Sequence, residues 1–227
     1  MARRLCAGSW RAARFGIDHG APDHRLMRPN ALDEAARAHD MAARLVAMAR
    51  GSDRLMAALR AVREQGLASW CIGAGAVRTL VWDHLCGLEQ PSEWPDCDVA
   101  YFEPCAPGQE RDPRIHASLA AAMPDVAWDV TNQAAVHRWH EAYFGHPAAP
   151  YRNLVEAVAS WPEFATCVGL TLAADDSIGV IAPHGLDDLF ARRVRYNPAR
   201  ATAAAYRERV AKKRYARRWP GVTVIPC

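Results

Sequence analysis

The first third of the chain carries a helical pattern of apolar positions. Between residues 32 and 65, apolar side chains such as Leu55 and Leu59 recur at three- and four-residue intervals within an Ala-rich segment, which is the period of one face of an α-helix. Gly51 and Ser52 interrupt the pattern, and serine is a favourable residue at the N-terminal cap of a helix. The pattern therefore predicts two helices, the second capped by Ser52.

Beyond residue 65, short apolar runs alternate with segments of helical composition. The runs are rich in Val, Ile, Trp and Tyr and end at Gly, Pro or Asp, which is typical of β-strands. Strands are expected at 70–72, 99–102, 126–130, 167–172 and 178–181, and helices at 76–86, 113–122, 134–143 and 186–191. This order predicts an α/β (α+β) fold in which a mixed β-sheet is flanked by helices.

Composition places the chain among soluble globular proteins. It has 227 residues, of which 51% are hydrophobic and 23% are charged, enough for one domain with a substantial core. No apolar run approaches the ~20 residues that span a bilayer, so no membrane association is expected. The seven cysteines are odd in number and lack a Cys-x-x-Cys motif, which predicts reduced thiols in a cytoplasmic protein rather than disulfides or a zinc site.

Charge divides the chain into three parts. Residues 1–31 begin with an Arg-rich, acid-poor segment, interpreted as a disordered or mis-annotated extension. Residues 32–191 form the expected domain, and residues 29–191 carry a net charge of −11. Residues 192–227 are a basic helix and tail, with eleven Lys or Arg between 192 and 218 against one acid, Glu208. The tail is expected to pack on the acidic domain.

Asp96 and Asp98 stand at the start of the strand expected at 99–102. Side chains two residues apart on a strand point to the same face, so both carboxylates project together. At ~4 Å and an effective dielectric near 20, they would repel by about 4 kcal/mol, which favours a bound proton or cation. Mg²⁺ suits such a site, because it takes one or two carboxylates together with phosphate oxygens. A strand start with solvated acids is the alternative.

A Gly-x-Gly turn, Gly73 to Gly75, joins an apolar strand to the next helix. Glycines let a backbone approach a ligand closely, and free N–H groups at a helix start can bind phosphate oxygens. Arg78 follows one turn into the helix, and its forked guanidinium matches phosphate geometry. A salt bridge to Asp83 or Asp98 is the alternative role for Arg78.

A third acid, Asp129, lies in the strand expected at 126–130. Asn132 and Gln133 follow it, and their amides can hydrogen-bond a base, a ribose or a metal-bound water. Capping of the following helix is an equally good use of these amides.

A series of short motifs recurs in the order typical of one protein family. With this series the chain resembles, over roughly residues 55–220, the small bacterial nucleotidyltransferase-like family (formerly a domain of unknown function) of the polymerase-β-type nucleotidyltransferase superfamily. Two departures, Thr79 in place of Asn and Ala135-Val136-His137 in place of Arg-Met-His, leave the three carboxylates untouched. The motifs are GAGAVR at 73–78, DCDVAYF at 96–102, WDVTNQA at 128–134, Pro150-Tyr151, Trp161-Pro162-Glu163 with Thr166, and APHGLDDLF at 182–190.

The resemblance implies an enzyme that transfers an NMP from an NTP to an acceptor hydroxyl and releases pyrophosphate. Asp96, Asp98 and Asp129 would be the catalytic residues and would hold Mg²⁺ or Mn²⁺. The nucleotide- and phosphate-binding residues would be Gly73, Gly75, Arg78, Asn132 and Gln133. The acceptor, whether small molecule, protein or RNA, and the base of the NTP stay open. A non-catalytic nucleotide- or RNA-binding module on the same fold is the alternative function.

The basic tail has two possible uses. Docked beside the acidic sheet, the helix expected at 206–219 would place some of Arg207, Lys212, Lys213 and Arg214 where they could hold nucleotide phosphates. Alternatively it would grip nucleic acid, since neutralisation of phosphates supplies most non-specific affinity. The aromatic residues of the segment, Tyr206, Tyr215 and Trp219, would then either stack on bases or pack the helix onto the domain.

Overall fold

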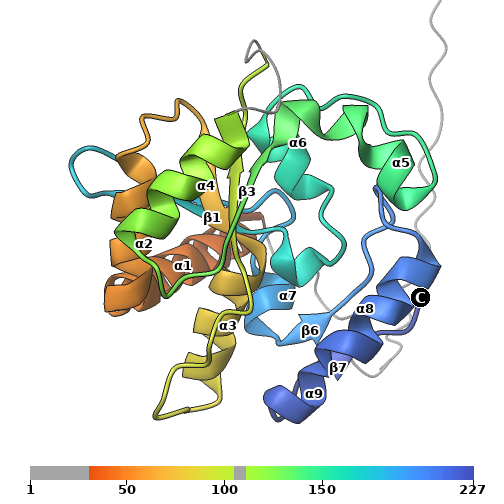
Figure 1. The fold of residues 1–227 in the computed structure, drawn as a ribbon. Coiled ribbons are helices and arrows are strands. Elements are labelled where there is room, and N and C mark those ends of the chain that lie inside the picture. The colour runs from red at the N-terminus through yellow and green to blue at the C-terminus, as the bar shows by residue number, and fades with distance from the viewer. Residues whose placement is uncertain (1–30, 105–110) are drawn as a thin grey trace, which may run out of the picture.

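The computed structural model describes residues 31–104 and 111–227. The expectation about residues 1–31 therefore falls almost wholly outside the described residues. The five strands of the main sheet are arranged in the order β3-β2-β1-β4-β5, and β2 and β3 are parallel while the other pairs are antiparallel (Figure 1). This confirms the mixed sheet. The strands are β1 Trp70–Gly73, β2 Cys97–Tyr101, β3 Trp128–Asn132, β4 Gly169–Leu172 and β5 Ile178–Ile181.

Helices surround this sheet, and most begin or end where the sequence predicts. Ser52 caps the second helix as expected, with its Oγ accepting a hydrogen bond from the N–H of Leu55 at 3.3 Å. The helix expected at 134–143 is wrong, because a 3₁₀ turn replaces its first half. In the described ranges, no helix combines the length and the apolar character that a membrane span requires. The elements are α1 Ala31–Arg50, α2 Asp53–Arg63, α3 Ala74–Leu85, α4 Arg111–Ala122, η1 Gln133–Arg138, α5 His140–Phe144, α6 Leu154–Ala159, η2 Phe164–Thr166 and α7 Asp187–Phe190.

The two faces of the sheet are covered unequally. Alternate strand residues such as Ile72, Val99 and Leu170 join a large core with α1 to α4, while the opposite face contributes only a small cluster, including Cys71 and Ala100, packed under α6. In Figure 1, α4 and α6 lie on opposite sides of the sheet. Because Asp98 precedes Ala100 by two residues, its side chain projects from this thinly covered face.

The C-terminal tail completes the large core. It comprises β6 Arg193–Val194, α8 Ala203–Lys213, α9 Tyr215–Arg218 and β7 Thr223–Val224, and β7 returns to pair with β6. The single helix expected at 206–219 breaks at Arg214, which adopts a left-handed conformation with φ of 48°. Tyr206, Tyr215 and Trp219 are buried. Their rings therefore pack the tail onto the domain and are not available to stack on bases.

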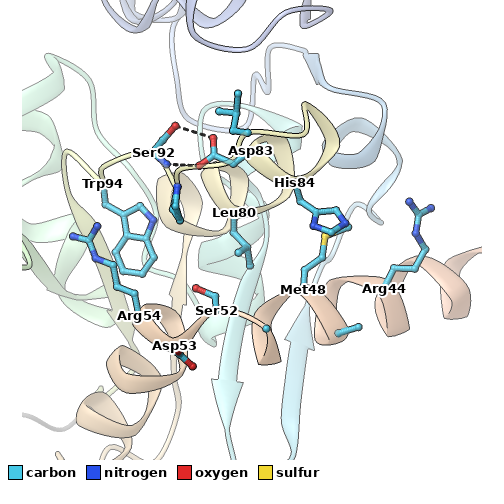
Figure 2. Close-up of a pocket in the computed structure, with 14 residues that line it drawn as sticks. Arg44, Met48, Ser52, Asp53, Arg54, Leu80, Asp83, His84, Ser92 and Trp94 are labelled. Atoms are coloured by element: carbon cyan, nitrogen blue, oxygen red, sulfur yellow. Dashed lines mark hydrogen bonds between the residues drawn. The ribbon is translucent and has the colours of Figure 1, made fainter.

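A buried carboxylate, Asp83, ties the tail to α3. Its Oδ1 accepts hydrogen bonds from the Trp219 indole N–H at 2.6 Å and from the Ser92 hydroxyl at 2.8 Å. Its Oδ2 accepts one from the Ser92 backbone N–H at 2.7 Å, and Figure 2 shows both Ser92 bonds. Asp83 thus joins α3, α9 and the loop that leads into β2. Because that loop also carries Asp96, Asp83 helps to fix both the tail and the position of Asp96.

We expect Trp219→Ala to destabilise the protein by about 3–5 kcal/mol, because it removes a buried aromatic side chain and leaves Asp83 short of a donor. Chemical denaturation followed by circular dichroism would measure the loss. Val155→Ala on α6, where half of the side chain is exposed, is the matched control and should change stability by less than about 0.5 kcal/mol. Equal effects of the two substitutions would show that the tail is not part of the folding unit.

Candidate functional site

Sheet register brings two of the predicted acids side by side. Asp98 on β2 pairs with Gly73 on β1 and, in the parallel direction, with Asp129 on β3. Neighbouring strands lie ~4.8 Å apart, and residues in register on parallel strands share a face. Asp96 immediately precedes β2. The Asp129 carboxylate is exposed and accepts a hydrogen bond from the Thr131 hydroxyl at 3.4 Å.

The two glycines of the turn have different roles. A Cβ on Gly73 would lie 2.6 Å from the Trp161 ring and 2.8 Å from the Val168 carbonyl oxygen, so this glycine allows close packing. A Cβ on Gly75 would instead touch the two carboxylates, at 3.4 Å from Asp96 Oδ1 and 3.9 Å from Asp98 Oδ2. Gly75 therefore keeps open the space between the acids at the start of α3. Its backbone N–H donates a hydrogen bond to Asp98.

The crowding of like charges shows in the protonation of Asp98. Burial, together with the negative charges of Asp96 and Asp129, raises the pKa of Asp98 from 3.8 to about 6, while the Gly75 hydrogen bond and Arg209 act in the opposite direction. Ionisation of Asp98 is therefore less favourable than that of an ordinary aspartate, and a bound cation would stabilise the ionised form.

Two cations from the tail reach the same place. Asp96, Asp98 and Gly75 line a cavity of about 140 Å³ together with Thr166, Arg209 and Lys213. Lys213 Nζ lies 3.9 Å from Asp96 Oδ2. The sequence predicted that some tail cations would lie here and named Lys213 among them, but it did not single out Arg209. The basic composition of the tail was the signal that could have pointed to Arg209. It does not show which face of the helix packs on the domain, because that depends on contacts between residues far apart in the sequence.

The carboxylates of this cavity suit a divalent cation. Their oxygens are hard ligands of the kind that Mg²⁺ and Mn²⁺ prefer, the raised pKa of Asp98 marks a shortage of positive charge, and Gly75 leaves the space between them unfilled. In the described ranges, however, no three Asp, Glu, His or Cys side chains converge on one metal position. Asp129 is not among the residues that line the cavity, so its part in a metal site stays a prediction.

Arg78 is enclosed rather than open to the cavity. The side chain is only 1% exposed and its guanidinium lies over the rings of Trp82, Tyr215 and Trp219, at 5.1–5.5 Å from their centroids. Burial lowers its pKa from the usual value. Arg78 Nη2 lies 3.8 Å from the position of a Gly75 Cβ, which is also close to the oxygens of Asp96 and Asp98, so this nitrogen borders the space between the acids.

Asn132 and Gln133 lie at the other end of the strands. Asn132 pairs with Tyr101, three residues or about 10 Å along β3 from Asp129. Its Oδ1 accepts the backbone N–H groups of Ala134 and Glu103, both at 3.1 Å. Asn132 therefore caps η1, the structural alternative that the sequence allowed. The Gln133 amide bonds to the Thr131 carbonyl at 3.4 Å. The structure does not bring these amides to the acids.

A larger cavity, of about 800 Å³, lies between the α1–α2 elbow and α3 (Figure 2). Its walls are mainly apolar and include Met48, Leu80 and Trp94, with the Arg54 guanidinium over the Trp94 ring at 4.5 Å. Asp83 at its edge is fully engaged by Ser92 and Trp219. The carboxylate pair does not line this cavity, so the chemistry indicated by the acids belongs to the smaller one.

We expect Asp98→Asn to stabilise the metal-free protein at neutral pH. Because the folded state holds the Asp98 proton more tightly than the unfolded chain does, the contribution of this group to stability falls as pH rises from about 4 to about 6. After allowance for its partial exposure, the variant should gain about 1–2 kcal/mol over wild type at pH 7.5 and almost nothing at pH 4. Denaturation in EDTA at both pH values measures the difference. A variant less stable than wild type at pH 7.5 would contradict the proposed crowding.

Comparisons with known proteins identify the family and support the fold. A family model described as nucleotidyltransferase matches residues 60–224. A solution structure described as revealing a CCA-adding enzyme head domain has a TM-score of 0.68 and 26% identity, covering 81% of this chain and 95% of that one. A tRNA-processing enzyme, apo form I, matches with a TM-score of 0.45 and 16% identity over 76% of this chain and 43% of its own, too weakly to carry an argument. No curated protein sequence is significantly similar. The chain belongs to the nucleotidyltransferase family whose model spans residues 60–224.

Proposed function

We propose that this nucleotidyltransferase is metal-dependent and transfers an NMP from an NTP to an acceptor hydroxyl. One observation carries the proposal: Asp96 and Asp98 face a small cavity at the start of α3, and Gly75 leaves the space between them open. Asp96, Asp98 and, from the neighbouring strand, Asp129 would hold Mg²⁺ or Mn²⁺. When bound, the metal supplies positive charge that activates the hydroxyl and neutralises the α-phosphate.

The reaction itself requires positioning more than covalent chemistry from the protein. The acceptor oxygen bonds to the α-phosphorus, the bond from that phosphorus to the bridging oxygen breaks, and pyrophosphate leaves with the electron pair. The hydroxyl proton passes to a carboxylate or to water. Trp161 and Pro162 also line the cavity, and their apolar surfaces limit the access of bulk water, which strengthens the charge interactions there.

The acceptor we favour is an RNA hydroxyl. The similarity to a CCA-adding enzyme head domain supports this class, and so does the outer surface of α8 and α9, where Arg207, Lys212, Arg214 and Arg217 are exposed. Exposed cations on α8, which also lines the cavity, and on the following segment suit a phosphodiester chain. A small-molecule or protein hydroxyl stays an outcome of the experiment.

We expect wild-type protein to transfer label from at least one of the four α-³²P-labelled NTPs, with Mg²⁺ or Mn²⁺, to an acceptor in cell extract. The Asp96→Asn/Asp98→Asn double variant should lose transfer by at least about 10³-fold, whereas Asp125→Asn, an exposed acid ahead of β3, should retain it. Nuclease or protease sensitivity of the labelled species identifies the acceptor. Transfer that survives in the double variant or in EDTA would overturn the metal assignment.

Gly75→Ala should fold normally and lose activity. The new methyl group meets no atom closer than 3.4 Å and alanine favours a helix over glycine by up to about 1 kcal/mol, but the methyl fills the space between the acids and should slow transfer by about 100-fold. Gly73→Ala should instead unfold at lower temperature, because its methyl group would overlap Trp161. Thermal unfolding and transfer assays on both variants separate the two effects. Full activity of Gly75→Ala would show that this space holds no reacting group.

A further inference from the structure

We propose that Arg209 and Lys213 of α8 form the binding site for the triphosphate of the NTP, and that Glu163 is a positioning residue for Arg209. The inference rests on the proposed function, since it assigns the anionic end of the same substrate. Both cations line the cavity that contains Asp96 and Asp98.

The size of the cavity indicates which part of the NTP it can hold. At about 140 Å³ it is smaller than the ~300–1,000 Å³ of sites that enclose a whole drug-sized molecule. It has room for several water-sized groups at ~30 Å³ each. A short phosphate chain fits, while the base and ribose lie outside. The phosphate chain must also lie beside the acids, because that is where the α-phosphate reacts.

Arg209 is held in a fixed orientation by a buried acid. Its Nε donates to Glu163 Oε1 at 2.9 Å, and the Tyr215 hydroxyl donates to the same oxygen at 2.6 Å. The Glu163 side chain is 1% exposed, whereas that of Arg209 is 31% exposed. Because the bond uses Nε alone, the terminal nitrogens of Arg209 remain available at the cavity, in the forked geometry that phosphate oxygens accept.

Lys213 lies one helical turn further along the same face. Its side chain is 20% exposed, and its Nζ forms a long ion pair with Asp96 Oδ2 at 3.9 Å. Burial lowers its pKa, as do the positive charges of Arg209 and Arg78, while Asp96 and Asp98 act in the opposite direction. Three cations, Arg78, Arg209 and Lys213, therefore lie close to the acids. Their positive charges are complementary to a polyphosphate that would bind beside the carboxylates.

A buried donor without a partner points to the same ligand class. Within the described residues, Nε and Nη1 of Arg78 have no hydrogen-bond partner, although the side chain is almost completely buried and its Nη2 borders the space beside Gly75. A buried guanidinium with unsatisfied donors is costly in a low-dielectric setting. Glu163 contributes negative charge nearby, and a bound triphosphate in the adjoining cavity would add to it.

The test measures binding of inorganic tripolyphosphate with Mg²⁺ by calorimetry, so that neither the base nor turnover enters. Lys213→Met and Arg209→Gln should each weaken binding by about 10- to 100-fold. Arg37→Gln, at an exposed cation of α1, is the control for loss of one positive charge and should change binding less than about twofold. Melting temperatures check that the variants fold. Affinities of the Lys213 and Arg209 variants equal to that of the Arg37 variant would overturn the assignment.

The role of Glu163 needs a readout that simple destabilisation would not move. In Tyr215→Phe, which removes one of the two donors to Glu163, and in Glu163→Gln, the preference for NTP over NMP should fall by about tenfold while NMP affinity is kept. A parallel loss of NTP and NMP binding would show that Glu163 is merely structural.

If wild type binds tripolyphosphate through Lys213 but transfers no nucleotide, the proposed function fails and the binding site stands. Transfer with an unchanged KM for NTP in Lys213→Met refutes only the binding site.

Discussion

The constraint on which this structure depends is the crowding of acids at one edge of the sheet. The strand register places Asp98 beside Asp129, and Asp96 lies immediately before β2. A protein gains nothing in stability from such a group, because like charges close together in a poorly solvated place repel by several kcal/mol. Positive charge must come from elsewhere. The net charge of −11 on residues 29–191 and the excess of cations in the tail are the sequence-level trace of that requirement.

The tail meets the requirement only because apolar packing holds it in place. Surface ion pairs alone contribute about 0–1 kcal/mol, and the Lys213–Asp96 pair is long. Burial of Trp219 and Tyr215 against Trp82, with edge-to-face contacts at 5.2 and 5.8 Å between ring centroids, provides the larger energy. The aromatic residues thus fix the helix, and the helix then presents its cations to the acids.

The sequence predicts the sheet and the acids well because both depend on local patterns. Alternation of apolar and polar residues places Asp96 and Asp98 on one face, and the glycine turn marks the start of α3. Asn132 illustrates the limit: two further residues of β3, beyond the expected end at Val130, move its amide about 10 Å from the acids. Arg209 illustrates a second limit. The sequence of a basic helix does not show which cation faces inward until the aromatic residues that pack the helix onto the core are known.

Arg78 links these two levels of organisation. Its guanidinium contacts rings from α3 and from the tail, and its Nη2 borders the same space beside Gly75 as the carboxylates of Asp96 and Asp98. A misplaced tail would expose the guanidinium to water and remove its field from the site, since water screens charges far more strongly than the protein interior does. Docking of the tail and the electrostatics of the carboxylate pair are therefore one property of the fold. This is why the motif of residues 73–78 and the aromatic residues near the C-terminus, more than 130 positions apart, belong to the same functional unit.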